Sequence, residues 1–220
     1  MSTQSLAQIG RRIGFPIVLA LLLLTATAIH PSPIQAPQTG EAQIDMGSVN
    51  DSVYTNSFFG MSYELPKNWY VDKLAMDADN SNAKQFLARG APAGYQSFSL
   101  LKISQNPADG LRVRGPRLNL DVTSAPPKDV TARGVLSGTK RLLSQQPTAQ
   151  IIRDLTDCSF GGHAFVRMDV EWRLPGGNVA YEGDAVTIVK GYLVQFQILA
   201  DSPEQLNDLF GTFNSLKFTP

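Results

Sequence analysis

The chain has 220 residues and carries 19 Lys and Arg residues against 19 Asp and Glu residues, so its formal net charge is +0. This balance excludes the strongly basic surface of a nucleic-acid-binding domain and the polybasic segment that binds anionic lipid headgroups. The length suits one domain, large enough to bury a core without disulfides.

The first element in chain order is a targeting signal. Arg11 and Arg12 precede an uncharged apolar run over residues 13–29, which ends in small residues. A basic, then apolar, then small segment is typical of a secretory signal peptide. Because the run is short for a membrane span, which takes about 20 apolar residues, we predict a signal peptide at 1–28. The arginine pair also allows a twin-arginine export signal as an alternative.

The end of this segment offers a cleavage site. Ala26 and Ala28 form an A-x-A pattern, so we predict cleavage after Ala28, with a second candidate after Ala36. The mature chain would then carry 17 basic residues (19 minus Arg11 and Arg12) and 19 acidic residues, a net charge of −2. We expect a secreted or periplasmic protein. The alternative is an uncleaved signal that anchors the protein at the inner membrane, with its domain facing outward.

A spacer separates the signal from the folded part. Residues 29–51 are rich in proline, glutamine and small residues and show no apolar period, which predicts a flexible linker. A domain is then expected over 52–220. Cys158 is the only cysteine, so no intramolecular disulfide forms, and no cysteine follows the apolar run to carry a lipid. We expect Cys158 to be buried as a small hydrophobic residue.

Short strands are predicted in the first half of this domain. Phe59, Met61, Tyr63 and Leu65 alternate with small or polar residues, and Pro66 ends this strand. The acidic and asparagine-rich stretch 75–82 predicts a loop. Further strands are expected near 69–71, over 84–89, over 97–104 and around 118–122.

The second half shows clearer periods. Apolar residues recur at steps of three and four between residues 132 and 143, which predicts an amphipathic helix. Three alternating segments, around 164–173, 179–189 and 192–200, predict an antiparallel meander. Ser202, Pro203 and Gln205 then form the capping pattern of a last helix. Together these elements predict an α+β fold, an antiparallel β-sheet covered by helices, with Trp69 and Trp172 as core anchors.

Two segments carry a family resemblance. The run Tyr54-Thr-Asn-Ser-Phe-Phe-Gly-Met-Ser-Tyr-Glu-Leu-Pro-Lys-Asn-Trp69 resembles the opening of the PsbP-like family, with its "YxNxxFGxxxxxPxxW" segment. The closing meander, with Ser202-Pro-Glu-Gln and Phe213-Asn-Ser-Leu-Lys-Phe218, is similar to that family's end. The resemblance covers about residues 52–219. It implies the PsbP-like sandwich, shared with DcrB-like envelope proteins, and roles in binding or assembly, with no catalytic residue to carry over.

Few residues offer chemistry. His163 is the only histidine in the predicted domain and could act as a general base, but no nucleophile motif accompanies it, so we interpret it as a turn residue. Four carboxylates, Asp169, Glu171, Glu182 and Asp184, lie on neighbouring predicted strands. They could serve a hydrolase, but we interpret them as cross-strand charge pairs on a solvated face.

Ligand and metal sites receive little support. Arg112, Arg114 and Arg117 could contact an anionic ligand, although a solvated loop explains them as well. One histidine and one cysteine cannot make the usual zinc site, and the acidic stretch 77–82 lacks the glycine and glutamate of a calcium loop. We therefore assign no catalytic, cofactor-binding or metal-binding residue.

From these observations we expect an exported, non-enzymatic binding or assembly module of the cell envelope. It would present a sheet edge or a loop surface to an envelope protein, and it would touch the membrane only through an uncleaved signal anchor. The alternative is an extracytoplasmic hydrolase that uses His163 or the strand carboxylates. That alternative requires a histidine or carboxylate with a shifted pKa inside a pocket.

Overall fold

Two antiparallel sheets form the framework of the computed structural model, which describes residues 44–88, 95–107, 115–124 and 130–219. The small sheet has the order β1-β2-β3-β11 and the large sheet the order β4-β5-β6-β10-β9-β8-β7. The strands are β1 (Ser48–Asn50), β2 (Val53–Asn56), β3 (Met61–Glu64), β4 (Tyr70–Val71), β5 (Ser97–Ser104), β6 (Arg117–Ser124), β7 (Ala149–Phe160), β8 (His163–Arg173), β9 (Val179–Val189), β10 (Tyr192–Ala200) and β11 (Lys217–Phe218).

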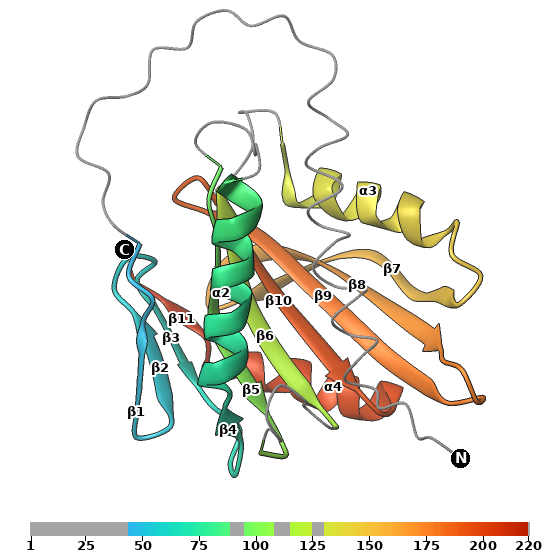
Figure 1. Ribbon diagram of the computed structural model, residues 1–220, viewed down its shortest axis with the longest axis horizontal. Helices are drawn as coiled ribbons and strands as arrows, with labels where there is room; N and C mark the ends of the chain where they lie inside the picture. Colours follow the sequence, from blue (N-terminus) through green and yellow to red (C-terminus); the bar gives the residue numbers. More distant parts are fainter. Residues whose placement is uncertain (1–43, 89–94, 108–114, 125–129, 220) are drawn as a thin grey trace, which may run out of the picture.

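Helices cover both faces of the large sheet (Figure 1). On one face lie α2 (Lys73–Ala88), which packs on β5, and α3 (Ala132–Leu143), which packs on β7, β8 and β9. On the other face lie α4 (Pro203–Gly211), the short 3₁₀ helix η2 (Thr212–Ser215) and the small sheet. This arrangement confirms the predicted α+β sandwich. None of the described helices is long and apolar enough to cross a bilayer.

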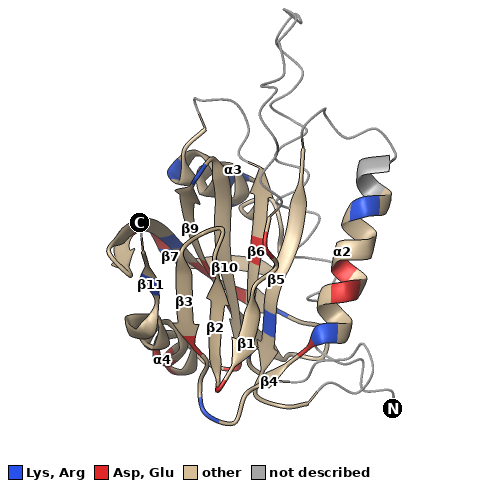
Figure 2. Ribbon diagram, turned by 90° about the vertical axis from the view of Figure 1, so that its left-hand side faces the viewer, with Lys and Arg blue, Asp and Glu red and all other residues tan. Residues whose placement is uncertain are grey.

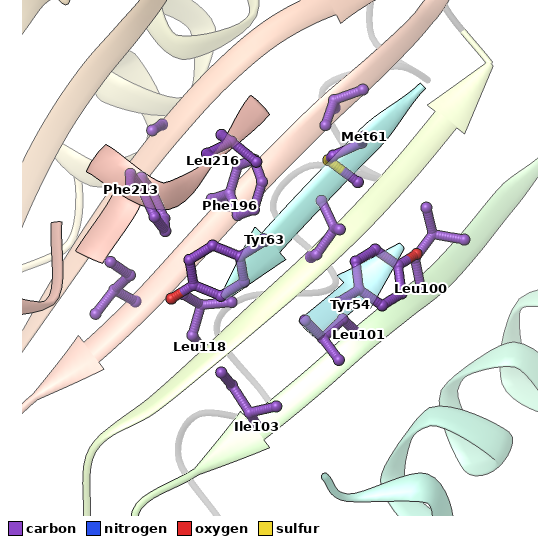
Figure 3. Close-up of a cluster of buried hydrophobic side chains, with 14 of the residues drawn as sticks. Tyr54, Met61, Tyr63, Leu100, Leu101, Ile103, Leu118, Phe196, Phe213 and Leu216 are labelled. Atoms are coloured by element: carbon purple, nitrogen blue, oxygen red, sulfur yellow. The ribbon is translucent and has the colours of Figure 1, made fainter. Parts of the chain in front are cut away.

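The larger core lies between the two sheets. Figure 3 shows Tyr54, Met61 and Tyr63 of the small sheet directed toward side chains of β5 and β6 in the large sheet. Phe196 and Phe213 close this core from β10 and η2. A smaller core joins α3 to the opposite face of the large sheet, with Val135, Leu136 and Leu143 of α3 packed against β8 and β9; its strand residues include Val166, Met168, Val170 and Trp172. Trp172 is therefore the core anchor that was predicted, and Trp69 is half-buried against the larger core.

The second half of the chain follows the sequence pattern closely. Strands β8, β9 and β10 form the predicted meander, and Lys190 and Gly191 turn between β9 and β10 with φ of 51° and 78°. Such a pair of positive φ values suits the twist of a two-residue hairpin. Ser202 caps α4 by accepting a hydrogen bond from the Gln205 amide, and the Gln205 side chain accepts one from the Asp201 amide. The predicted capping pattern is confirmed.

The first half departs from the prediction at α2. Residues 75–82, predicted as a loop, and residues 84–88, predicted as part of a strand, belong to this one helix. Asp72 begins the helix, because its carboxylate accepts a hydrogen bond from the Ala75 amide at 2.9 Å. The Asn80 side chain then bonds the backbone of Ser99 in both directions, at 3.1 and 2.8 Å. Contacts with the sheet thus offset the weak helix propensity of Asp, Asn and Ser.

Two other features differ from expectation. β7 is a full strand of 12 residues that was not predicted, and its pairing with β8 is irregular between Ile151 and Arg153 and again between Arg153 and Thr156. Such bulges break the alternation that sequence analysis relies on. The folded part also reaches further back than residue 52, because Ile44 is buried in the larger core and β1 pairs with β2. Residues 44–51 of the predicted linker are therefore folded, and the signal with Ala28 lies outside the described residues.

Candidate functional site: a buried polar strip and an exposed corner

His163 is not placed for acid–base work. It opens β8 directly after the turn at Gly161 and Gly162, as the sequence suggested. Its ring lies against the ring of Phe218, with 4.2 Å between the centroids. Within the described part of the chain, the His163 side chain shows this ring contact and no hydrogen bond or ion pair, while its backbone pairs with Phe160. The contact with Phe218 gives His163 a packing role where the β7–β8 hairpin meets β11.

The carboxylates of the strand pair are buried, which corrects the prediction of a solvated face. The exposed fraction is 3% for Asp169, 7% for Glu182 and 3% for Asp184. The prediction failed because helices cover the large sheet on both faces, so polar residues that alternate with apolar ones do not reach water. Glu171 is half-buried and lies 3.5 Å from Arg173. Burial of a carboxylate is costly unless donors compensate it, so the partners of each carboxylate decide its role.

Asp169 is held by two arginines on the face that α4 covers. Arg167 donates from Nε to Oδ1 and from Nη2 to Oδ2, both at 2.7 Å. Arg153 donates from Nε to Oδ2 at 2.8 Å. The Arg167 guanidinium also lies 3.6 Å from the centre of the Phe210 ring and donates to the Asn207 side chain of α4. This group joins β7, β8 and α4 and leaves the carboxylate no free role.

On the opposite face, polar side chains cross the sheet in a row. The strand registers place Lys102 of β5, Asn119 of β6, Gln197 of β10 and Asp184 of β9 side by side. Their neighbours in the adjacent rows are Arg117, Asp121, Glu182 and Gln195. We call these eight residues the polar strip. It runs from the strand under α2 to a strand under α3, and Asn119, Glu182, Asp184 and Gln197 are buried.

Hydrogen bonds tie the strip together around Glu182. Trp172 donates from Nε1 to Oε2 of Glu182, and Gln197 donates from Nε2 to Oε1, each at 3.0 Å. Asn119 in turn donates to Gln197 Oε1 at 3.0 Å. Burial raises the pKa of Glu182, and these donors and the charge of Arg117 oppose the rise. Both oxygens of Glu182 are thus satisfied within the sheet.

Asp184 carries the strongest electrostatic cost of the strip. Burial and then the charge of Glu182, two residues along the same strand face, raise the pKa of Asp184 well above its usual range, and a hydrogen bond from Gln195 at 2.8 Å opposes the rise. Two carboxyl groups this close share one proton more readily than they carry two charges. Of the two carboxyl groups, Asp184 is therefore the one whose pKa is raised more strongly.

We expect Asp184→Asn to stabilise the protein at pH 7 and above. The folded-state pKa of Asp184 is raised, so its carboxyl lowers stability progressively as pH rises above the unfolded pKa, near 4. The amide imitates the protonated acid and removes this loss. Urea unfolding between pH 4 and pH 8 should show an advantage of the variant that grows with pH. The exposed Asp201→Asn is the control, and an advantage that is the same at every pH would contradict the assignment.

The end of the strip under α2 is less satisfied. Lys102 pairs with Asp79 of α2 at 2.9 Å, with both side chains mostly buried. Burial raises the pKa of the neighbouring Asp121, while the charge of Lys102 opposes the rise. Oδ1 of Asp121 is buried and has no hydrogen-bond partner within 3.5 Å among the described residues. A protonated Asp121 needs no counter-charge here, which is consistent with its burial.

Of the three arginines considered as ligand contacts, only Arg117 is described. It begins β6 inside the polar strip, not in a loop, and burial lowers its pKa while Glu182 and Asp79 oppose this effect. Its charge compensates these acids, and its side chain is half-buried. Arg112 and Arg114 lie outside the described residues. Within the described ranges, no cluster of His, Cys, Asp and Glu side chains could hold a metal ion.

Cys158 is half-buried in β7, less deeply than expected, and its thiol lies 3.7 Å from the Phe165 carbonyl oxygen. Burial raises the pKa of this thiol. A thiol with a raised pKa is a poor nucleophile at neutral pH. Cys158 therefore packs against the larger core, as the sequence analysis expected of it.

The most exposed apolar side chains lie together at the corner between β4 and α2. Tyr70 is 50% exposed and Leu74 is 54% exposed, and they are four positions apart along the chain. Lys67 and Lys73 are also exposed here. We call Lys67, Tyr70, Lys73 and Leu74 the β4–α2 corner. The other large exposed apolar residues of the described chain, Ile152 and Val179, lie on β7 and β9. Sequence analysis missed the corner because it took α2 for a loop and a strand.

The free edge of the large sheet at β7 is protected. Its two irregularities twist the strand, and ion pairs join it to α3: Lys140 with Asp154 at 2.7 Å and Arg133 with Asp157 at 2.6 Å. Bulges and charges are the devices that keep edge strands from pairing with other chains.

Comparison with known proteins gives structural likeness only. No protein-family model matches the sequence, and no curated protein matches it. Among solved structures, the chain is similar to a PsbP (CyanoP) of Synechocystis sp. PCC 6803, with 17% identity, a TM-score of 0.44, and coverage of 86% of this chain and 100% of that one. It is also similar to LpqN of Mycobacterium tuberculosis, involved in cell envelope biogenesis, with 16% identity, a TM-score of 0.44, and coverage of 73% and 83%.

A third similar structure is a protein of unknown function from Pseudomonas aeruginosa, with 12% identity, a TM-score of 0.39, and coverage of 60% and 87%. A PsbP is therefore among the solved structures that the chain is similar to, as the resemblance of residues 52–219 led us to expect. These likenesses concern the fold, and no function is transferred from them.

Proposed function

We propose that this protein is a non-enzymatic binding or assembly module that works in the cell envelope, and that its contact surface is the β4–α2 corner. The signal predicted at residues 1–28 from the sequence supports export. The observation that carries the choice of surface is the exposure of Tyr70 and Leu74 at one corner. Single exposed apolar residues are ordinary on a protein surface, so the choice rests on these two being the most exposed of the large apolar side chains in the described chain and lying four positions apart.

The state of the ionisable groups supports binding over hydrolysis. The Asp169 carboxylate accepts hydrogen bonds from Arg153 and Arg167. The Glu182 carboxylate accepts hydrogen bonds from Trp172 and Gln197. The His163 ring lies against the Phe218 ring. A hydrolase would need a carboxyl or imidazole within reach of a substrate. The raised pKa values of Glu182 and Asp184 come first from burial in the sheet, and for Asp184 also from the charge of Glu182, which are structural causes.

Photo-crosslinking in intact cells tests this function. A photoreactive amino acid at position 70 or 74 should yield adducts with an envelope component, and the same amino acid at Ile152 or Val179 should yield far fewer, although these positions are similarly exposed. Mass spectrometry of the adducts reads the component and the mature N-terminus together. Equal yields from all four positions would contradict the assigned surface. A substrate turned over by the purified protein, with activity lost in His163→Ala, would contradict the non-enzymatic role.

A further inference from the structure

We infer that the β4–α2 corner binds the surface of an anionic lipid bilayer, with Tyr70 and Leu74 in the headgroup region and Lys67 and Lys73 against lipid phosphates. This inference rests on the proposed function, because it names the envelope component that the same corner contacts. It adds a membrane contact within the folded domain to the signal anchor considered from the sequence.

The apolar side chains of the corner suit a shallow contact. Trp69 packs on the larger core, so the adjacent Tyr70 faces outward, and Leu74 stands in the first turn of α2. A tyrosine has an apolar ring and a polar tip, which favours the boundary between headgroups and acyl chains. A stable protein interface buries about 800 Å² on each partner. Two half-exposed side chains supply far less, whereas a peripheral membrane contact combines a small apolar area with charge attraction.

Both charged residues that define the corner are lysines. Between residues 66 and 74 the exposed charged residues are Lys67 and Lys73. Asp72 is 6% exposed, and its carboxylate caps α2 through the Ala75 amide, so it does not face the solvent beside the lysines. The next exposed acids along the chain are Glu64 and Asp77 on either side. Lys67 and Lys73 thus present two positive charges at the corner, which complement lipid phosphates.

The backbone holds these side chains in place. The Trp69 amide donates to the Pro66 carbonyl at 3.2 Å, and Asn68 turns the chain with φ of 62°. The Asp72 amide then donates to the Lys102 carbonyl of β5 at 2.8 Å, which fixes the start of α2 to the large sheet. Figures 1 and 2 show the turn before β4 and the start of α2 at the same end of the molecule. A planar surface can therefore meet both segments without a change of fold.

Vesicle binding by the exported protein tests the inference. Mixed phosphatidylglycerol–phosphatidylcholine vesicles should bind the protein, pure phosphatidylcholine vesicles should bind it less, and added salt should weaken the difference. The double variant Lys67→Glu/Lys73→Glu should bind the mixed vesicles at least about thirty-fold more weakly, the loss expected for two lysines near an anionic surface. Lys84→Glu/Lys217→Glu changes the net charge equally at exposed positions elsewhere and should bind like the native protein.

The apolar part of the contact is tested separately. Tyr70→Ser/Leu74→Ser should weaken binding to the mixed vesicles, and Ile152→Ser/Val179→Ser should not. All variants share the native N-terminus, so any contribution of the signal segment cancels in these comparisons. Equal binding by the corner variants and their controls overturns the membrane contact. If crosslinks from position 70 then lead to a protein, the corner remains the contact surface and only the lipid is wrong. If the crosslinks also fail, both proposals fall.

Discussion

Replacing Asp169 with asparagine is expected to lower the free energy of unfolding by about 3–5 kcal/mol, the cost of leaving a buried charge without its partner. The carboxylate side chain is 4% exposed and Arg167 is 12% exposed. Asparagine keeps the shape, but its amide group would point donors at the guanidinium donors of Arg167 and Arg153. The measurement is urea unfolding of both proteins at neutral pH, with the midpoint and slope compared.

The chain offers a matched control for this prediction. Arg133 and Asp157 form an ion pair of similar length, 2.6 Å, but their side chains are 45% and 78% exposed. Asp157→Asn should therefore cost at most about 1 kcal/mol. In the double variant Asp169→Asn/Arg167→Gln the loss should be smaller than the sum of the two single losses, because the unpaired charge is gone. If Asp169→Asn and Asp157→Asn lowered the free energy of unfolding equally, burial would not be what makes the Asp169 ion pairs strong.

Phe213→Ala is expected to destabilise the protein by about 3–5 kcal/mol, the range for removing a fully buried aromatic side chain. Phe213 has no exposed surface and joins four aromatic rings; the centroid distances are 4.7 Å to Phe196, 5.1 Å to Phe160, 5.5 Å to Phe210 and 5.7 Å to Tyr63. These rings belong to β3, β7, β10 and α4. Loss of the Phe213 ring leaves a cavity between these elements, which the surrounding structure closes only partly.

Thermal unfolding should show a fall of about 10 °C in Tm, at the 2–4 °C per kcal/mol usual for a chain of this size. Phe58→Ala is the control, because Phe58 is only half-buried and meets Phe59 and Tyr192 at the edge of the same core. It should cost clearly less. A similar Tm for the two variants would contradict the view that η2 closes the core between the sheets.

The polar strip illustrates how far sequence reasoning reached at the candidate sites. The carboxylates and their strands were identified correctly, because alternation over β8 and β9 is a local pattern. Their environment was not, since the same alternation fits a strand with one wet face and a strand covered on both faces. Glu182 and Asp184 are buried because α3 packs over β8 and β9. Periodicity describes one segment at a time, so it does not predict that α3 packs on β8 and β9.

The helix α2 shows the same limit from the other side. Asp, Asn and Ser favour turns when they bond the local backbone, and the stretch 75–82 has many of them. In the folded chain their bonds go to the large sheet, from Asn80 to Ser99 and from Asp79 to Lys102. The exposed β4–α2 corner exists only because this segment is a helix, so no sequence signal could have indicated it.

The sequence by itself determined the meander of β8 to β10 and the capped helix α4, and it predicts an export signal at residues 1–28. These features rest on local chemistry: the order of charged and apolar residues, alternation along a strand, and side chains that cap a helix. Only the tertiary structure decided which carboxylates are buried, where α2 forms and which apolar residues stay exposed. Burial is set by the elements that stack on both faces of the large sheet, and those elements are distant along the chain.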